Sequence, residues 1–239
     1  MIKVRQPEEI YQASGQIENG SFRGRWHFSF DQYDDPEYRR FGPLRVFNDD
    51  TLSPGAIWPL HPHNNIEVVT YCAEGEFRHA DENGKGGVLE KGWVQHTSVG
   101  RGMWHSEINN RPDAPMRFIQ MWFLPNQSDI EPAVRQRKVD KSTRRGHLLA
   151  LVSNKHVSSL PIAADVEVFS SFLEIGKSVE HALAPRRGAY LYVVEGGPVD
   201  VNGYHLPALA AAKITDERVV SIQADGDAEF LLVDVPLES

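Results

Sequence analysis

Apolar and polar residues alternate over short stretches along most of the chain, and turn-forming residues separate these stretches. Short stretches rich in Val, Ile, Tyr, Phe and Trp that end at Gly, Pro, Asn or Asp predict β-strands. The clearest are GSFRGRWHFSF, NIEVVTYCAEGEFRHAD, MRFIQMWFLP, EVFSSFLEIG, AYLYVVEGGPVDVNG and EFLLVDVP. The pattern therefore predicts an all-β protein built as sandwiches or barrels. The segment DIEPAVRQRK (129–138) is the best candidate among a few short helices.

A short internal repeat indicates a duplicated β-domain. YCAEG (71–75) and YVVEG (192–196) share their Tyr, Glu and Gly. Such self-similarity predicts two related units, which we place at 1–128 and 147–239 with a connector at 129–146. In the register of this repeat, His61 and His63 fall on Ala182 and Ala184. The second unit is therefore predicted to lack whatever the two histidines do.

Composition narrows the class of protein. The chain has 239 residues, of which 41% are hydrophobic and 24% charged, as in ordinary globular proteins. Its net charge of −8 argues against direct nucleic-acid binding, and we interpret the basic stretch at 134–147 as a solvated connector. The single cysteine, Cys72, excludes an internal disulfide. With no membrane-length apolar run and no signal-peptide pattern, we expect a cytoplasmic protein.

Two histidines stand two residues apart, at His61 and His63. Side chains with this spacing point to one face of a strand but diverge on a helix, and Pro62 between them disfavours a helix. The segment GRGMWHSE repeats the spacing with His105 and Glu107. If both pairs face inward on neighbouring strands, three imidazoles and one carboxylate meet at one point.

Such a ligand set is typical of a transition-metal site. Imidazole and carboxylate suit Fe, Ni, Cu, Mn, Co and Zn, and four ligands leave about two positions of an octahedron open for reaction. The absence of thiolate ligands argues against a closed structural zinc site. A lone His-x-His among 10 histidines is often coincidental, but two ligand pairs with the same spacing favour a metal.

These segments resemble a known family. GAIWPLHPHNNIEVVTYCAEG (55–75) resembles the first cupin motif, and GRGMWHSE (100–107) resembles the second motif in its pirin form. FSFDQYDDPEYRRFGPLRVFNDD (28–50) and VQHTSVGRGMWHSE (94–107) are also pirin-like, so the resemblance covers most of residues 20–125. It implies a bicupin, with two double-stranded β-helix (jelly-roll) barrels of which the C-terminal one is degenerate.

The resemblance also implies a ligand set. One divalent metal, Fe(II) before Ni, Co, Mn, Cu or Zn, would be held by His61, His63, His105 and Glu107. Glu67 is the glutamate that the general cupin motif places among the ligands. Here it is expected instead to contact a ligand residue, or to have a structural role.

Bacterial pirin-like proteins of this type resemble quercetin 2,3-dioxygenases. The resemblance implies that dioxygen opens the central ring of a flavonol, with loss of carbon monoxide, and Glu107 would be both ligand and proton acceptor. The family also includes regulators, so one alternative is a metal- or redox-responsive protein that binds a protein partner without turnover. Another is an oxygenase of a different substrate.

The remaining candidates are interpreted without a metal role. We predict surface or wall positions for His79 and His96, and turn or cap positions for Asp49 and Asp50. His27 is predicted to be structural, with a hydrogen bond to a metal ligand as the alternative. A further set of apolar residues could line an aromatic pocket or belong to the core: Phe47, Trp58, Met103, Trp104, Met121 and Phe123.

Overall fold

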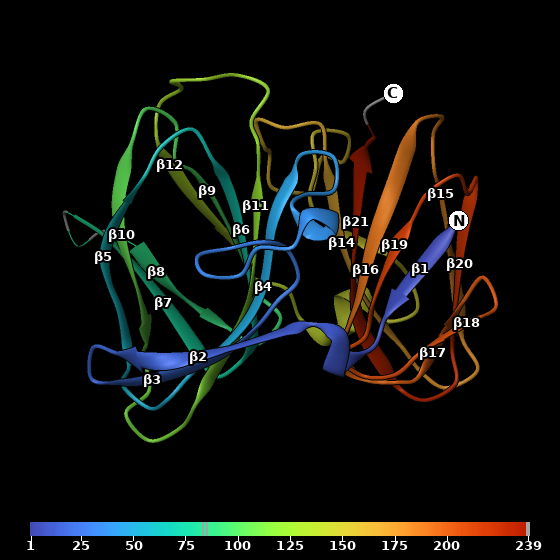
Figure 1. The fold of residues 1–239 in the computed structure, drawn as a ribbon, viewed down its shortest axis with the longest axis horizontal. Coiled ribbons are helices and arrows are strands. Elements are labelled where there is room, and N and C mark those ends of the chain that lie inside the picture. Colours follow the sequence, from blue (N-terminus) through green and yellow to red (C-terminus); the bar gives the residue numbers. More distant parts are fainter. Residues whose placement is uncertain (83, 85, 238–239) are drawn as a thin grey trace. The chain divides into compact units, whose positions relative to one another are not determined.

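The computed structural model describes residues 1–82, 84 and 86–237, which form two compact units (Figure 1). We call Tyr11–Val139 with Leu160–Ala164 the first barrel. The second barrel comprises Met1–Ile10, Asp140–Ser159 and the chain from Asp165 onward. Strands make up nearly all of the regular structure, so the all-β class is confirmed.

The first barrel consists of two facing sheets. The seven-stranded sheet has the order β12-β9-β6-β11-β4-β3-β2, and the four-stranded sheet has the order β5-β10-β7-β8 (Figure 1). Its elements are β2 (Tyr11–Ile17), β3 (Gly20–Trp26), a 3-10 helix (Pro36–Tyr38), β4 (Leu44–Leu52), β5 (Ile57–His63), β6 (Glu67–Glu74), β7 (Glu76–Asp81), β8 (Gly86–Glu90), β9 (Val94–Ser98), β10 (Met103–Asn109), β11 (Met116–Phe123) and β12 (Ala133–Arg137).

The second barrel also has two sheets. Their orders are β1-β19-β16-β21-β14-β13 and β15-β20-β17-β18. Its elements are β1 (Ile2–Arg5), a 3-10 helix (Pro7–Glu9), a 3-10 helix (Lys141–Arg144), β13 (Leu149–Val152), β14 (Glu167–Leu173), β15 (Ser178–Ala182), β16 (Arg187–Gly196), β17 (Val199–Val201), β18 (Tyr204–Leu206), β19 (Ala211–Ile214), β20 (Val219–Ala224) and β21 (Ala228–Pro236).

The strand orders of the two barrels match. In the larger sheets, β12-β9-β6-β11-β4 corresponds to β1-β19-β16-β21-β14, and in the smaller ones β5-β10-β7-β8 corresponds to β15-β20-β17-β18. The repeated glycines also match. Gly75 (φ +73°) and Gly196 (φ +69°) adopt left-handed conformations, and a Cβ on either would lie within 3 Å of a carbonyl oxygen, that of Pro115 or Asp227. The duplication predicted from the sequence is thus present as topology and as local geometry.

Each barrel is made of more than one stretch of the chain, whereas the sequence predicted one continuous range for each domain. Residues 1–10 count with the second barrel because β1 pairs with β19, and Leu160–Ala164 counts with the first barrel. The segment 129–146, predicted as a connector, contains β12 and the helix Lys141–Arg144. The predicted helix at 129–138 is wrong, because Ala133–Arg137 pairs with β9 and completes the edge of a sheet.

The two interiors differ in polarity. A cluster of apolar side chains fills the interior of the second barrel, and it includes Val220 and Ile222 of β20. In the first barrel an apolar cluster around Phe77, Leu89 and Phe118 fills one part of the interior, and polar side chains from β4, β5, β10 and β11 line another. No helix among the described residues is long and apolar enough to cross a bilayer.

Candidate metal centre

Strand β10 supplies two of the predicted ligands. Its sequence MWHSEIN alternates between buried and more exposed positions, which is the period-two pattern of a strand with one face inward. His105 and Glu107 lie on the buried face, while Trp104 points outward and is 49% exposed. The alternation therefore aims the imidazole and the carboxylate into the barrel.

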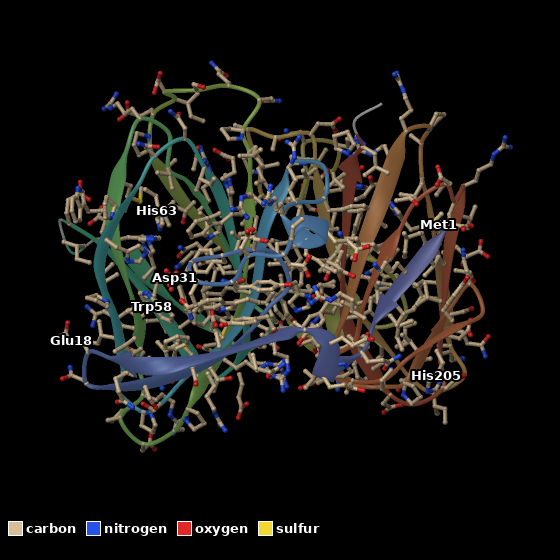
Figure 2. All side chains as sticks on the ribbon, in the orientation of Figure 1. Met1, Glu18, Asp31, Trp58, His63 and His205 are labelled. Atoms are coloured by element: carbon tan, nitrogen blue, oxygen red, sulfur yellow. The ribbon has the colours of Figure 1, made fainter. Side chains whose placement is uncertain are left out.

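Strand β5 supplies the other two. It lies at the edge of the four-stranded sheet, which accommodates Pro59 and Pro62 because an edge strand has a row of unpaired backbone groups. Figure 2 shows His63 and Trp58 at opposite ends of this strand. The pairing with β10 shifts by one residue between His105 and Glu107, a bulge that lies beside the site.

The three histidines form one cluster. One ligand nitrogen from each of His61, His63 and His105 lies within 4.8 Å of the others, and no second such group occurs in the described part of the chain. The Nε2 atoms of His61 and His105 are 3.1 Å apart. Two nitrogens that bind one ion at about 2.0–2.1 Å can be at most about 4.2 Å apart, so this pair already lies within reach of a shared ion.

A hydrogen bond and burial keep a nitrogen lone pair of these rings available for a metal. His61 Nδ1 donates to the carbonyl oxygen of Pro59 at 2.8 Å, which leaves the lone pair on Nε2. Burial, followed by the charge of His61, lowers the pKa of His63 to about 4 and that of His105 to about 2. Both rings are therefore neutral at pH 7, the protonation state that binds a metal.

One buried nitrogen of the cluster indicates that a metal fits the site. His63 Nε2 is buried and has no hydrogen-bond partner among the described residues. A buried polar atom without a partner costs free energy, and a cation between the three rings would satisfy it. Because all the cluster donors are imidazole nitrogens, the set fits a divalent transition metal.

Glu107 is buried beside this cluster. Gln120 Nε2 donates to Glu107 Oε1, and Gln120 Oε1 accepts from Trp122 Nε1 at 2.6 Å. Burial raises the pKa of Glu107, and the nearby His61 and the Gln120 hydrogen bond oppose that rise. Together with His61 and His63, Glu107 lines a cavity of about 80 Å³.

The cavity has an aromatic wall and a polar wall. Its lining consists of Phe30, Asn48, Asp50, Trp58, His61, His63, Glu107, Gln120 and Trp122. Trp122 also meets His63 edge-on, with ring centroids 4.6 Å apart. Of the six apolar residues singled out in the sequence, Trp58 lines this cavity. Phe47, Met103, Met121 and Phe123 are buried, and Trp104 is exposed.

Comparison with known proteins gives the family. A model described as Pirin matches residues 9–123, and one described as the quercetinase C-terminal cupin domain matches 150–235. A pirin-like protein of Caulobacter vibrioides is 37% identical over 222 residues, which cover 92% of this chain and 95% of the relative. The chain belongs to the pirin family. Its expected bicupin fold is thereby confirmed.

Two further matches to this pirin, one sequence and one solved structure, come from Escherichia coli. A protein of strain K12 named quercetin 2,3-dioxygenase is 34% identical over 237 residues, 99% of each chain. The structure of the bacterial pirin YhhW in complex with nickel(II) matches all of both chains with a TM-score of 0.91 and 31% identity. One full-length match is therefore named quercetin 2,3-dioxygenase, and one full-length structural match contains nickel(II).

Two adjacent aspartates of this pirin are not turn or cap residues, contrary to the sequence prediction. Both belong to β4, where consecutive side chains point to opposite faces. Asp49 binds Arg117 Nε and Nη2 at 2.7 Å each, whereas Asp50 lines the cavity and accepts from Trp26 Nε1 at 3.1 Å. Burial raises the pKa of Asp50 well above its ordinary value, and the charges of Asp49 and Glu107 add to the rise.

Glu67 and three further histidines of the first barrel, His27, His79 and His96, occupy interior positions. His79 is buried with Nε2 3.1 Å from His105 Nδ1. Glu67 contacts His96 Nε2 at 2.7 Å and Ser98 Oγ at 2.6 Å, so it has a structural role away from the cluster. His27 is buried against Phe47, with ring centroids 4.7 Å apart. His79 and His96 are thus fully interior, and neither lies at the surface.

Four strands of this pirin each contribute to the site a pair of residues at a spacing of two, and β5 adds Trp58. The pairs are Asn48 and Asp50, His61 and His63, His105 and Glu107, and Gln120 and Trp122. The two pairs that contain histidine stand out in the sequence. The other two carry the same spacing, which is the sequence pattern by which they could have been found.

Proposed function

We propose that this pirin is a metal-dependent dioxygenase that opens the central ring of a flavonol such as quercetin. The observation that carries the proposal is the cluster of His61, His63 and His105 beside a cavity that Glu107 also lines. The full-length relative named quercetin 2,3-dioxygenase supports the substrate class. The reaction consumes one flavonol and one dioxygen, both oxygen atoms enter the ring-opened ester, and carbon monoxide leaves.

The proposed metal ligands are the three histidines and Glu107. Fe(II) is the proposed ion, and Ni, Co, Mn, Cu and Zn are the alternatives that this ligand set accepts. A divalent metal bound there supplies Lewis acidity, which lowers the pKa of a substrate hydroxyl. The side chains around it bind the substrate and move its proton.

Glu107 is proposed to accept the proton of the flavonol 3-hydroxyl. Burial raises the pKa of Glu107, so its carboxylate takes up a proton more readily than an exposed glutamate would. The amide of Gln120 holds one carboxylate oxygen and leaves the other available. Asn48 and Asp50 provide further polar groups on the same wall for the substrate hydroxyls.

The aromatic wall has to move for a flavonol to bind. A cavity of about 80 Å³ holds a water or a dioxygen, whereas sites for drug-sized ligands have roughly 300–1,000 Å³. Phe30, Trp58 and Trp122 form the apolar side of the cavity. Rotation of these rings would widen the cavity and provide faces for stacking on a flat substrate.

The test is turnover of quercetin by protein reconstituted anaerobically with each metal. Oxygen uptake and loss of the flavonol absorbance band should depend on the metal. Glu107→Gln should lower kcat by at least about 100-fold, the lower end for a general base, and retain most of the metal. His105→Ala should lose both metal and turnover, and Glu74→Gln, an exposed glutamate on β6, serves as the control.

Two results would contradict the proposal. Full activity of Glu107→Gln would remove the proton-acceptor role. Tight metal binding by the wild-type protein without turnover of any flavonol would exclude this substrate class and favour another substrate or the partner-binding regulatory role.

A further inference from the structure

A buried histidine lies directly behind one of the metal-site histidines. His79 on β7 is 2% exposed, and its Nε2 lies 3.1 Å from His105 Nδ1, the nitrogen that faces away from His61. The two rings meet at a steep angle of 70°, with centroids 5.1 Å apart. His105 is therefore contacted on both ring nitrogens by other histidines.

The hydrogen-bond pattern fixes where the protons can lie. Because His61 Nδ1 donates to Pro59, His61 Nε2 bears a lone pair. In the protein without a metal, His105 Nε2 then carries the proton that lies between these two rings, and His105 Nδ1 accepts from His79 Nε2. A metal ligand at His105 Nε2 needs a lone pair there, so the His105 proton must then be on Nδ1 and point at His79.

We propose that His79 is a positioning residue of the metal centre: its Nε2 accepts the Nδ1 proton of His105 and fixes that ring and its tautomer for ligation. The inference rests on the metal site of the proposed function. Histidine ligands usually donate to a carboxylate, a backbone carbonyl or water, and here the partner is a neutral imidazole. Metal binding therefore inverts the tautomers of both rings, with the His79 proton on Nε2 before and on Nδ1 after.

His79 is well placed for this role because its strand is fixed on both sides. The backbone of His79 pairs with Glu107 of β10 and with Gly87 of β8. At the adjacent Gly86 a Cβ would meet the carbonyl oxygen of His79, so glycine allows β8 to approach closely. The Nδ1 of His79 is buried and has no hydrogen-bond partner among the described residues, so no hydrogen bond at that nitrogen holds the ring in one tautomer.

The tautomers can be measured by ¹⁵N NMR on histidine-labelled protein before and after addition of Zn(II). We expect the proton of His79 to move from Nε2 to Nδ1 when the zinc binds, while His96, which contacts Glu67 through Nε2, keeps its tautomer. A residue that only fills space behind His105 would not change its tautomer. Zn(II) serves as the probe because it is diamagnetic and keeps the histidine signals visible.

The second test of the proposal measures the affinities for Zn(II) and Co(II) by competition with a chelator. His79→Leu should weaken binding by about 10- to 100-fold, the usual cost of losing such a partner, and should shift the Co(II) absorption bands. His79→Gln keeps an acceptor oxygen and should restore most of the affinity. His96→Gln, at a buried histidine of the same barrel, should bind like the wild-type protein.

The outcomes separate this inference from the proposed function. An unchanged His79 tautomer, or wild-type affinity in a folded His79→Leu variant, overturns the positioning role while the metal site stands. If His79→Leu does not fold, the wild-type NMR result and the His79→Gln affinity decide. Failure of the wild-type protein to bind either ion would overturn the metal site and with it this inference.

Discussion

At the residue scale, Glu107 depends on two side chains of β11 for its orientation. An indole nitrogen only donates, so the Trp122 N–H requires the oxygen of the Gln120 amide to face it. The amide nitrogen of Gln120 must then face Glu107 and donate to it. Trp122 therefore determines which end of Gln120 the carboxylate meets, although Trp122 itself makes no hydrogen bond to Glu107.

Removing this indole N–H should loosen Glu107 without removing the metal. Trp122→Phe keeps an aromatic ring beside His63 but frees the Gln120 amide to rotate. Loss of one such hydrogen bond, about 0.5–1.5 kcal/mol, predicts a 2- to 10-fold decrease in kcat for quercetin at unchanged metal content. The measurement is steady-state kinetics together with metal analysis.

Trp104→Phe is the matched control for this prediction. Trp104 lies on β10 but points outward and is 49% exposed, so its substitution should leave kcat unchanged. An equal decrease in both variants, or a decrease in Trp122→Phe that follows metal loss, would contradict the orienting role.

Residue types explain which parts of the site the sequence could predict. Histidines at a spacing of two are rare enough to stand out, and His61, His63 and His105 are brought together as the pattern predicted. Asp50 and Gln120 carry the same spacing, but aspartate and glutamine are common at turns and surfaces. Their burial follows from pairing between distant strands, β4 with β11, which one sequence does not reveal.

At the scale of elements, Glu67 joins two strands and a distant segment. Its carboxylate contacts His96 and Ser98 of β9 and accepts the backbone N–H of Ala163 at 3.1 Å. Burial raises the pKa of Glu67, but these hydrogen bonds outweigh it, and the pKa lies below the ordinary value of 4.5. The ionised form is therefore the one that stabilises β6, β9 and the segment Leu160–Ala164.

This pKa shift predicts how stability changes with pH. A carboxyl whose folded pKa is lowered contributes fully above its unfolded pKa, near 4.5, and loses the contribution as pH falls through the folded value. Glu67→Gln should cost at least about 2 kcal/mol at pH 7 because it weakens hydrogen bonds to a charged group. The cost should shrink below about pH 4.5, as measured by urea unfolding from pH 7 to pH 3.

Glu74→Gln tests the same substitution at an exposed position on the same strand. It should leave the free energy of unfolding nearly unchanged at every pH. A Glu67→Gln cost that is constant across the whole range would show that packing, rather than the charge of Glu67, stabilises this network.

The sequence predicted some secondary-structure elements correctly and one element wrongly. Strands rich in apolar and aromatic residues, such as β11 and β21, were predicted from the sequence. Residues 133–137 were predicted as helix because AVRQR has good helix formers, but they pair with β9 along its whole length. The backbone hydrogen bonds of a sheet edge outweigh the weak helical preference of five residues.

At the scale of the whole molecule, each barrel contains a piece from the other half of the sequence. β1 pairs with β19 through Ile2↔Ile214 and Val4↔Ala212. Leu160–Ala164 belongs to the first barrel, where the Ala163 carbonyl also accepts the backbone N–H of Asn126 at 2.8 Å. The order of residues along the chain therefore does not follow the division into barrels.

Deletion of residues 1–5 should affect the second barrel. Without β1, the edge of β19 is open, and an open edge loses stability and invites association between copies. Hydrogen exchange should accelerate in Ala211–Ile214, while β2 and β3, which follow β1 directly in the sequence, keep their protection. Metal content should not change, because the three histidines belong to the first barrel.

The opposite pattern, with loss of protection in β2 and β3 and none in β19, would contradict the grouping of β1 with the second barrel. The full-length protein, exchanged under the same conditions, gives the reference rates. Size-exclusion chromatography of the deletion variant reports the association between copies.

The interlaced division of the chain has a consequence for inheritance. A single genetic crossover near codon 139 would join an N-terminal half from one parent to a C-terminal half from another. The second barrel would then fold with a β1 from the wrong parent, and Glu67 would face a foreign segment in place of Leu160–Ala164. Neither barrel can be exchanged whole by one such event, so the barrel that carries the three histidines and the second barrel are expected to diverge together, as one unit of selection.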